Sequence, residues 1–442
     1  MITICKSICF FLCICLLCFY IFYIFAASFH YRSINYKNKF MKKNNLLIIF
    51  AIGLLFTGCS NVDNPIMNDE ISIKNDYASL HIDSQEALDI ANKVLYGDKS
   101  TRNSNNNTPT FNYVVNDNIT RSLNIPDTLA YVINYPNNGG FVIVSTDRRV
   151  YPVLAFSNKG QFSFENESAK SNFIENIGTY IGKADITSSY NVEEGDFDGC
   201  YSVNPIIQTS LSQGSPWNKY VIKEHPGCPA GCVAVATALV MSNSKTELQY
   251  HGSTYYFKSI IDAIYKKQGK PTDSEQERIA SAKDTNQPTY TYEQAVDSMA
   301  KLIYWIGKDV DMSYAVTGSG ADSEDAYNLC KKLDYSIPSG YASFDINEIS
   351  WYLKDNHIIY LRGTDTKGRG GHAWVSDGCY FCVNQSDRRQ ILETYIHCDW
   401  GWGGSSNGYY SGEVFEALKY SFKPLNYFAL KRPGINFIFS SK

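Results

Sequence analysis

The stretch from Gly227 to Met241 reads Gly-Cys-Pro-Ala-Gly-Cys-Val-Ala-Val-Ala-Thr-Ala-Leu-Val-Met. The residues after Cys232 are small and apolar, without charge or proline, which predicts a helix buried on most of its faces. Cys232 is then expected at the N-terminus of this helix, where free N–H groups and the helix dipole lower the pKa of a thiol. A single cysteine that begins a core helix is more often an inert buried residue. Other parts of the sequence must decide between these two interpretations.

The composition is typical of a soluble globular protein. The chain has 442 residues, of which 44% are hydrophobic and 19% are charged. This length predicts two or three domains. The formal net charge of -4 gives no electrostatic reason to expect binding to nucleic acid or to an anionic membrane surface.

Two apolar segments lie near the N-terminus. The first, residues 4–27, is long enough to span a bilayer. The second, residues 41–59, has the basic start, short apolar run and small final residues of a signal peptide. Its end resembles a bacterial lipobox, so Cys59 is predicted to carry a lipid and to become the mature N-terminus. We interpret residues 1–40 as an upstream extension, with a genuine hydrophobic anchor as the alternative.

The rest of the chain divides at a polar segment. Residues 60–80 are polar and predict a tether, and residues 81–185 predict a small α+β domain. Residues 186–204 are rich in Gly, Asp and Glu, which is typical of a linker open to proteolytic cleavage. Beyond it, helices come first and strands later, which predicts an α+β fold with separate layers. Besides the helix that starts at Cys232, helices are expected at 84–96, 168–181, 292–306 and 323–333, and early strands at 111–115, 129–135, 140–145 and 153–156.

A nucleophilic cysteine needs a general base, and the candidate is His372. It follows two glycines and precedes an apolar strand pattern, so a loop is expected to present it to a cleft. It lies about 140 residues after Cys232, within the range of about 130–150 that is typical of papain-type enzymes. A lone histidine is more often structural, but this spacing and the glycines favour the catalytic interpretation.

Two further segments supply candidate catalytic groups. A strand pattern ends at Asp399, whose carboxylate could accept a hydrogen bond from His372 and fix the orientation of the ring, with Trp400 as a shield against water. The alternative for this segment is a tight Gly/Trp turn that merely packs. Upstream, the side-chain amide of Gln213 and the backbone N–H of Cys232 could stabilise an oxyanion. The order Gln, Cys, His, Asp favours acyl transfer by a thiol.

The cysteines do not suggest a disulfide framework, because their number downstream of Cys59 is odd and their spacing irregular. Cys379 and Cys382 form a C-x-x-C, but no second pair completes a zinc site, so we interpret them as strand residues on opposite faces. Cys228 is interpreted as an inert core residue, with an oxidative partner of Cys232 as the alternative. No metal and no organic cofactor is expected.

These motifs together resemble the streptopain family of papain-like cysteine peptidases. The matching segments are Gln213-Gly214-x-Pro216-x-Asn218, Gly231-Cys232-Val233-Ala234-x-Ala236-Thr237-Ala238, Val310-Asp311-Met312-x-Tyr314 with Ser319-Gly320, Gly370-Gly371-His372-Ala373, and Trp400-Gly401-Trp402-Gly403-Gly404. Residues 140–149 resemble the propeptide of the family, so the resemblance covers about residues 81–433. It implies that Cys232 is the nucleophile, His372 the base, Gln213 the oxyanion-hole donor and Trp400 the residue that packs over the histidine. Similar enzymes often have Asn at the position of Asp399, so we expect activity with a changed pH profile.

The resemblance implies an α+β fold, with a papain-like two-layer peptidase domain at 198–433, a small α+β inhibitory propeptide at 81–197 and a tail at 434–442. We interpret the protein as a cysteine endopeptidase made as a zymogen, which cleaves proteins or peptides through a Cys-His thioester mechanism. Its own propeptide would be its intramolecular inhibitor. We expect a monomer that binds no nucleic acid. The expected location is the outer membrane, through a lipid on Cys59, or the periplasm or cell surface of a Gram-negative bacterium, or the medium after release.

Two other classes of function remain open. The first is a catalytically silent relative that binds peptides, which the presence of all four candidate catalytic side chains disfavours. The second is a cysteine amidase or acyltransferase that acts on glycans or cell-wall peptides, which the peptidase-type propeptide disfavours. A thiol-directed activity probe would test the first alternative, and a casein assay would test the second.

Overall fold

A computed structural model describes residues 80–97, 108–116, 125–163, 176–193, 195–197, 202–268, 287–364, 371–384, 386–387, 389–416 and 426–432. The chain divides into two compact units, Met1–Ile71 and Ser72–Lys442, and all described residues belong to the second. The predicted N-terminal segments, Cys59, the tether up to residue 79 and the tail at 434–442 therefore lie outside the described residues. Within the described ranges, no helix is long and apolar enough to cross a bilayer.

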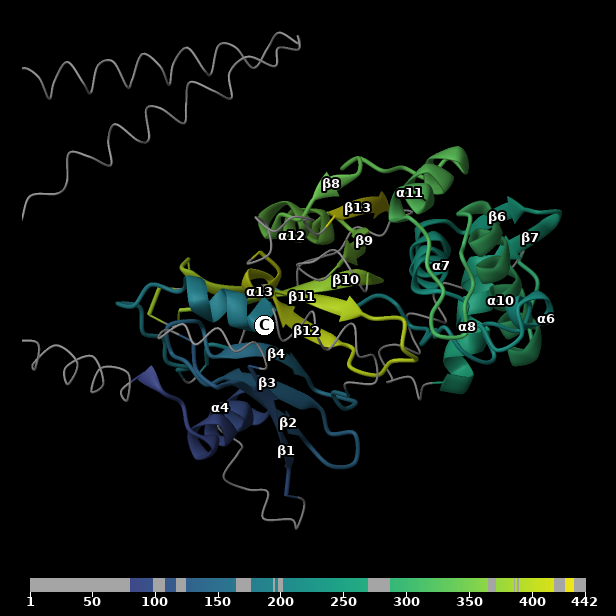
Figure 1. Ribbon diagram of the computed structural model, residues 1–442. Helices are drawn as coiled ribbons and strands as arrows, with labels where there is room; N and C mark the ends of the chain where they lie inside the picture. The colour runs from purple at the N-terminus through teal and green to yellow at the C-terminus, as the bar shows by residue number, and fades with distance from the viewer. Residues whose placement is uncertain are drawn as a thin grey trace, which may run out of the picture. The chain divides into compact units, whose positions relative to one another are not determined.

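One sheet extends through both parts of this unit, which we call the N-terminal domain (residues 80–193) and the C-terminal domain (residues 202–432). Its strand order is β1-β2-β3-β4-β12-β11-β10-β9-β13-β8, and β5 pairs with β10 (Figure 1). The strands are β1 (Thr110–Val115), β2 (Thr128–Asn134), β3 (Phe141–Ser145), β4 (Val153–Ser157), β5 (Ser202–Val203), β8 (Ala342–Ser343), β9 (His357–Gly363), β10 (His372–Val383), β11 (Ile391–Asp399), β12 (Gly408–Ser411) and β13 (Asn426–Lys431). A separate hairpin consists of β6 (Glu247–Tyr250) and β7 (Ser253–Tyr256).

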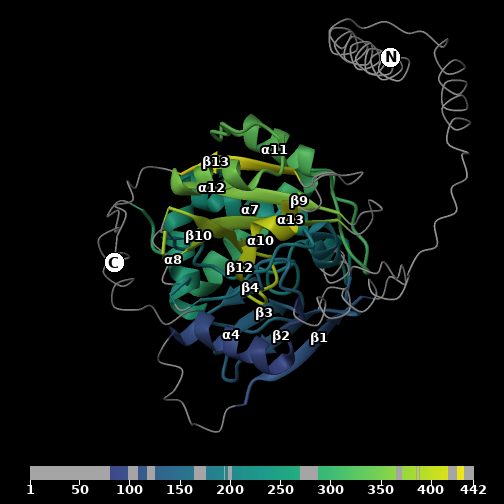
Figure 2. The same ribbon diagram turned by 90° about the vertical axis from the view of Figure 1, so that its left-hand side faces the viewer.

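The N-terminal domain contains the predicted strands β1 to β4 and the helix α4 (Ser84–Tyr96), which lies against the sheet (Figure 2). The carboxylate of Asp83 accepts a hydrogen bond from the backbone N–H of Glu86 at 2.9 Å and caps the helix start. Gly97, at φ 54°, ends the helix as predicted. A second helix includes residues 176–183, and its predicted start near residue 168 lies outside the described residues.

A layer of helices covers one face of the C-terminal part of the sheet. It contains α6 (Val221–Glu224), α7 (Cys232–Ser244), α8 (Phe257–Gln268), α10 (Tyr292–Asp309) and α11 (Ser323–Lys332). Helix α7 packs against α8, α10 and α11 on one side and against β9 and β10 on the other. Because it is enclosed in this way, nearly all of its residues are buried, as its apolar sequence predicts.

Alternation along β9 separates the two faces of the sheet. Ile358 and Tyr360 belong to the core around α7, whereas Ile359 and Leu361 belong to a second core that includes α12 (Ile346–Lys354). The short helix α13 (Gly412–Glu416) packs on this second side against β11 and β12. Neither the short helices nor this division of the core was predicted from the sequence.

The two domains share one hydrogen-bonded sheet instead of meeting only through side chains. Strand β4 pairs antiparallel with β12, where Phe156 is opposite Tyr409 and Ala155 is opposite Tyr410. Each domain therefore contributes strands and side chains to common cores. Two separate α+β domains were predicted from the sequence, but their continuous sheet was not.

The predicted linker at 186–204 has two different parts. Residues 185–191 are mostly exposed, including Ile186 at 57% and Tyr190 at 39%. By contrast, Asp196 is buried, and its backbone carbonyl accepts a hydrogen bond from the Cys382 thiol at 3.2 Å. The hydroxyl of Tyr380 donates to the backbone carbonyl of Phe197. The second part of the linker is therefore held against β10.

Candidate active site

Cys232 is the first residue of α7, as the sequence predicts. The residue before it, Gly231, has φ 90°, a conformation that side chains other than glycine rarely adopt. A Cβ atom at Gly231 would also lie 2.7 Å from Sδ of Met312. Glycine is therefore required both for the turn into the helix and for the close approach of Met312. Cys232 itself is half-buried.

His372 is the first residue of β10, and α7 packs against this strand. The backbone of Ala373, the residue after the histidine, lies close enough to the Cys232 thiol to lower its pKa, and Cys232 packs against the core that contains Ala373. The His372 ring is buried, and its Nε2 atom lies 2.9 Å from the carbonyl oxygen of Trp400. Because a carbonyl oxygen only accepts, Nε2 carries the proton and Nδ1 remains the basic nitrogen.

The electrostatics of this structure favour neutral forms of both groups. Burial raises the pKa of the Cys232 thiol, although backbone N–H groups of Ala373, Val233 and Cys232 itself oppose the shift. The predicted lowering of this pKa by the helix N-terminus is therefore wrong for this structure, because desolvation outweighs the N–H groups. Burial also lowers the pKa of His372 to about 4, against the effect of the Trp400 carbonyl. Among the described residues, the His372 ring makes no hydrogen bond to the thiol.

Asp399 does not make the predicted contact with His372. Its Oδ1 atom accepts a hydrogen bond from the backbone N–H of Gly401 at 3.0 Å, and the nearby side chain of Asn407 acts to lower the pKa of the carboxyl. The reason is local, because Asp399 ends β11 and its short side chain turns back onto the following loop. The Trp400 carbonyl takes the place at Nε2 that the sequence analysis gave to Asp399. Burial raises the pKa of Asp399 to about 6.

Three tryptophans surround the His372 ring. The centroid of Trp402 lies 5.0 Å from the imidazole, and those of Trp400 and Trp374 lie at 6.1 and 6.2 Å. The indole N–H of Trp400 donates to the carbonyl of Ser406 at 3.1 Å, which fixes the ring. Trp400 thus packs beside the histidine, but Trp402 lies closer. Trp374 was not among the predicted site residues, although its position two residues after His372 puts it on the same face of the strand.

Gln213 lies on a loop whose backbone contacts both the segment before Cys232 and the segment that contains Trp402. Its backbone carbonyl accepts a hydrogen bond from the N–H of Ala230 at 2.8 Å. Its neighbour Ser212 forms an isolated β-bridge with Trp402. The structure therefore brings the backbones of the Gln213, Cys232, His372 and Trp400 segments into one region.

Other residues of the quoted motifs hold the segment before Cys232. The side-chain amide of Asn218 donates to the carbonyl of Cys228 at 3.1 Å, and the Ser319 hydroxyl donates to the carbonyl of Pro229 at 2.7 Å. These contacts explain why Asn and Ser occur in segments far from the cysteine in sequence. They fix the path of the chain into Gly231 and α7.

Asp377 is a buried charge in β10 that the sequence analysis did not single out. One carboxylate oxygen lies 2.6 Å from Nδ1 of His397, and the other accepts from the backbone N–H groups of Ile206 and Ile207 at 2.8 and 2.7 Å. Asp377 therefore ties the start of the C-terminal domain to the sheet. The sequence signal for Asp377 is a charged residue inside an apolar strand pattern, because such a group needs polar partners when it is buried.

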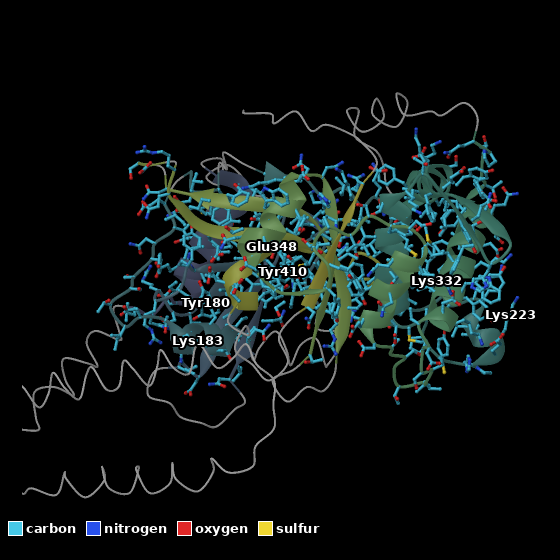
Figure 3. The ribbon with its side chains drawn as sticks, turned by 90° about the horizontal axis from the view of Figure 1, so that it is seen from above. Tyr180, Lys183, Lys223, Lys332, Glu348 and Tyr410 are labelled. Atoms are coloured by element: carbon cyan, nitrogen blue, oxygen red, sulfur yellow. The ribbon has the colours of Figure 1, made fainter. Side chains whose placement is uncertain are left out.

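A cavity of about 520 Å³ lies between the two domains, away from Cys232. Its lining includes Arg149, Tyr151, Tyr180, Lys183, Glu393 and Glu413. Figure 3 labels Tyr180 and Lys183, which come from the second helix of the N-terminal domain. Within the described ranges, no group of His, Cys, Asp and Glu side chains is arranged to hold a metal ion. The six cysteines of these ranges form no disulfide.

Comparison with known proteins gives matches over both domains. Residues 211–410 match the sequence model of the Peptidase C10 family, and residues 79–179 match that of the Spi protease inhibitor. Streptopain from Streptococcus pyogenes is 28% identical over 322 residues, which are 63% of this chain and 73% of streptopain. The thiol protease/hemagglutinin PrtT from Porphyromonas gingivalis is 25% identical over 312 residues, which are 64% of this chain and 33% of PrtT.

Among solved structures, a fragment of prointerpain A from Prevotella intermedia is 21% identical, with a TM-score of 0.43; the match covers 68% of this chain and 94% of the fragment. Active interpain A is also 21% identical, with a TM-score of 0.32 over 54% of this chain and 98% of interpain A.

The two family matches follow one another along the chain in the order that the sequence analysis predicts. They confirm the resemblance, the mixed α+β fold with a preceding inhibitor domain, and the class of enzyme. Residues 211–410 form a cysteine protease domain of the Peptidase C10, or streptopain, family, and residues 79–179 form a Spi-type inhibitor domain that precedes it as a propeptide.

Proposed function

We propose that this protease is an exported endopeptidase in which Cys232 is the nucleophile and His372 is the general base. The observation that carries the proposal is the packing of α7 against β10, in which the backbone of Ala373 lies close enough to the Cys232 thiol to lower its pKa. Cys232 begins α7 and His372 begins β10, so this packing places the thiol beside the residue that follows the histidine. A cysteine with an adjacent base is the arrangement that thiol catalysis needs.

The proposed reaction proceeds through a thioester. His372 takes the proton of the Cys232 thiol, and the sulfur attacks the carbonyl carbon of the scissile peptide bond. The backbone N–H of Cys232 and the side-chain amide of Gln213 donate to the oxyanion. Collapse of this intermediate breaks the C–N bond, and His372 gives its proton to the leaving amine. Water, deprotonated by His372, then hydrolyses the thioester, and the thiol regains its proton.

Asp399 and Trp400 are proposed to position the histidine. The Asp399 carboxylate holds the N–H of Gly401, and the side chain of Asn407 accepts from the N–H of Trp400 at 3.2 Å. These two contacts fix the loop, so that the Trp400 carbonyl faces Nε2 of His372. The orientation of the ring then depends on Asp399 indirectly, and Trp400 and Trp402 limit the access of water.

The arrangement in the full chain supports latency. The thiol and the imidazole are both held in their neutral forms and are not hydrogen-bonded to each other. We propose that residues 81–197 are the propeptide and residues 198–433 the mature peptidase. A hydrated site favours the thiolate–imidazolium pair, so we expect activation to require that water reaches Cys232 and His372.

The proposed export route rests on the sequence alone. Residues 41–59 would be the signal peptide, residues 60–80 the tether and residues 1–40 an upstream extension, with Cys59 lipidated in a Gram-negative cell. Mass spectrometry of the protein purified from membranes tests this proposal, because a lipid on Cys59 adds a diacylglyceryl mass to the first residue. A protein with an unmodified Cys59 and intact residues 41–58 would contradict it.

The catalytic proposal is tested with residues 60–442 and the matched Cys232→Ala variant, both incubated with reductant at neutral pH. We expect only the parent to lose the residues before about position 198 and to gain casein-cleaving activity. Mass spectrometry of the product gives the cleavage site. If an added protease trims both proteins and neither product cleaves casein, Cys232 is not the nucleophile of an active peptidase.

A further inference from the structure

Three tyrosines of the C-terminal domain surround one phenylalanine of the N-terminal domain. The ring of Phe156 in β4 lies 5.5 Å from Tyr380 of β10, 5.2 Å from Tyr395 of β11 and 5.3 Å from Tyr409 of β12. Tyr409 is stacked on Phe156, and the other two rings meet it edge-on. Aromatic pairs in such geometries contribute more than the area they bury. We call Tyr380, Tyr395 and Tyr409 the tyrosine socket.

Backbone contacts accompany the aromatic ones. Phe156 and Ala155 pair antiparallel with Tyr409 and Tyr410 of β12. The hydroxyl of Tyr395 donates to the carbonyl of Val153 in β4 at 2.8 Å. Recognition of β4 thus combines addition of a strand to a sheet edge with one anchored side chain, a common way of binding extended peptides.

Gly408 shows that β12 is shaped for this close approach. A Cβ atom at Gly408 would lie 2.7 Å from the carbonyl oxygen of Phe156, 2.9 Å from Cζ of Phe141 and 3.0 Å from Cβ of Ser157. All three atoms belong to the N-terminal domain. A methyl group at this position therefore clashes with the N-terminal domain, because its three nearest atoms all belong to that domain.

The tyrosine socket is separate from the catalytic cysteine. Tyr395 and its neighbours belong to the core around β4, whereas Cys232 packs against the core around α7. Figures 1 and 2 show β4 beside β12, while α7 packs on β9 and β10. The exposed residues 185–191 also lie outside the socket, so a cut there leaves its contacts intact.

We propose that the tyrosine socket and the edge of β12 form a peptide-binding exosite for an extended segment with an aromatic side chain, and that β4 still occupies it after the chain is cut. This inference rests on the proposed function, because it assumes cleavage between the two domains. The cut alone then leaves the inhibitor domain bound to the peptidase. Release requires Phe156 to leave the tyrosine socket.

The test uses residues 60–442 with Cys232→Ala, in which the recognition sequence of a site-specific protease replaces the exposed residues 186–189. After cutting, gel filtration and mass spectrometry measure how long the N-terminal domain stays associated. We expect a persistent complex for this parent, and dissociation about tenfold faster or more with Phe156→Ala or Gly408→Ala. Tyr113→Ala is the matched control, because it removes an aromatic ring of the same domain that is 57% exposed.

Thermal melting of the uncut proteins verifies that each variant folds. If Phe156→Ala does not fold, the dissociation rate of Gly408→Ala decides the test. The proposal is overturned if cutting releases the N-terminal domain of the parent at once, or if both variants dissociate at the rate of the parent. As a second readout, an excess of a peptide spanning residues 150–159 should accelerate release, and its Phe156→Ala form should not. Failure of the peptidase proposal is seen separately, as a lack of casein cleavage by the cut chain with Cys232 intact after its N-terminal domain has been released and removed by gel filtration.

Discussion

At the scale of single residues, Asp399 combines a buried negative charge with a hydrogen bond that shapes the catalytic loop. Asp399→Ala removes the acceptor for Gly401, and we expect kcat to fall about a hundredfold because the histidine loses its fixed position. Asp399→Asn keeps an acceptor oxygen at the same place and should retain most of the activity. A parent-like kcat for Asp399→Ala would show that the loop does not need this contact.

The same two variants predict a difference in the pH dependence of stability. The pKa of Asp399 is raised to about 6 in the folded protein, from 3.8. The contribution of a carboxyl with a raised pKa is fully present below pH 4 and is lost as the pH rises through 6. We therefore expect the free energy of unfolding of the parent to fall by a few kcal/mol between about pH 4 and 6 relative to Asp399→Asn. Chemical denaturation across this range measures the difference.

Gln213 is the residue whose proposed role depends most directly on its side chain. Gln213→Ala should lower kcat about 10² to 10³-fold with little change in stability, because a donor to the oxyanion acts mainly in the transition state. Gln268→Ala is a suitable control, since it removes the same amide from a surface contact with Ser210. Steady-state kinetics on a peptide substrate separates kcat from KM. A change in KM alone would assign Gln213 to substrate binding.

At the scale of elements, the entry into α7 depends on Gly231. Gly231→Ala forces an alanine to φ 90° and brings its Cβ within 2.7 Å of Met312, so we expect a loss of about 1–3 kcal/mol of stability and most of the activity. Gly214→Ala, next to Gln213, is the matched control because a Cβ there meets nothing within 4 Å. Thermal unfolding and casein cleavage measure both effects. If Gly231→Ala melts and cleaves like Gly214→Ala, the turn before α7 tolerates a side chain.

The elements also show what the sequence could predict. The start of α7 follows from an apolar run, and α10 begins at Tyr292 as expected because Thr291 and Gln294 form a reciprocal cap. The cysteine and histidine segments were identified from their glycines and spacing. The contact of Asp399 with Gly401 was not, because the sequence does not tell whether a short acidic side chain turns to its own loop or across a cleft. The pairing of β4 with β12 depends on tertiary packing and has no local signal.

At the scale of the whole molecule, the contact between the two domains contains a buried carboxylic acid, Glu393. Ionisation of this acid weakens the contact. Glu393 of β11 lines the cavity between the domains, together with Arg149, Tyr180 and Lys183 of the N-terminal domain. Burial first, and then Glu413, raise the pKa of Glu393 to about 8 from 4.5. The remaining charged or titratable groups that line the cavity are Tyr151, Asp185, Tyr190 and Glu416.

The direction of the effect follows from this raised pKa. The free energy by which protonated Glu393 stabilises the folded protein is fully present below about pH 4.5 and is lost as the pH rises through 8. We therefore predict that the Cys232→Ala chain loses a few kcal/mol of stability between pH 5 and 8, and that Glu393→Gln, which stays neutral, removes most of this slope. Glu247→Gln, at an exposed position of β6, should leave the slope unchanged. Equal slopes for Glu393→Gln and Glu247→Gln in denaturation experiments would mean that Glu393 is hydrated in the assembled protein, and that its burial does not couple the two domains to pH.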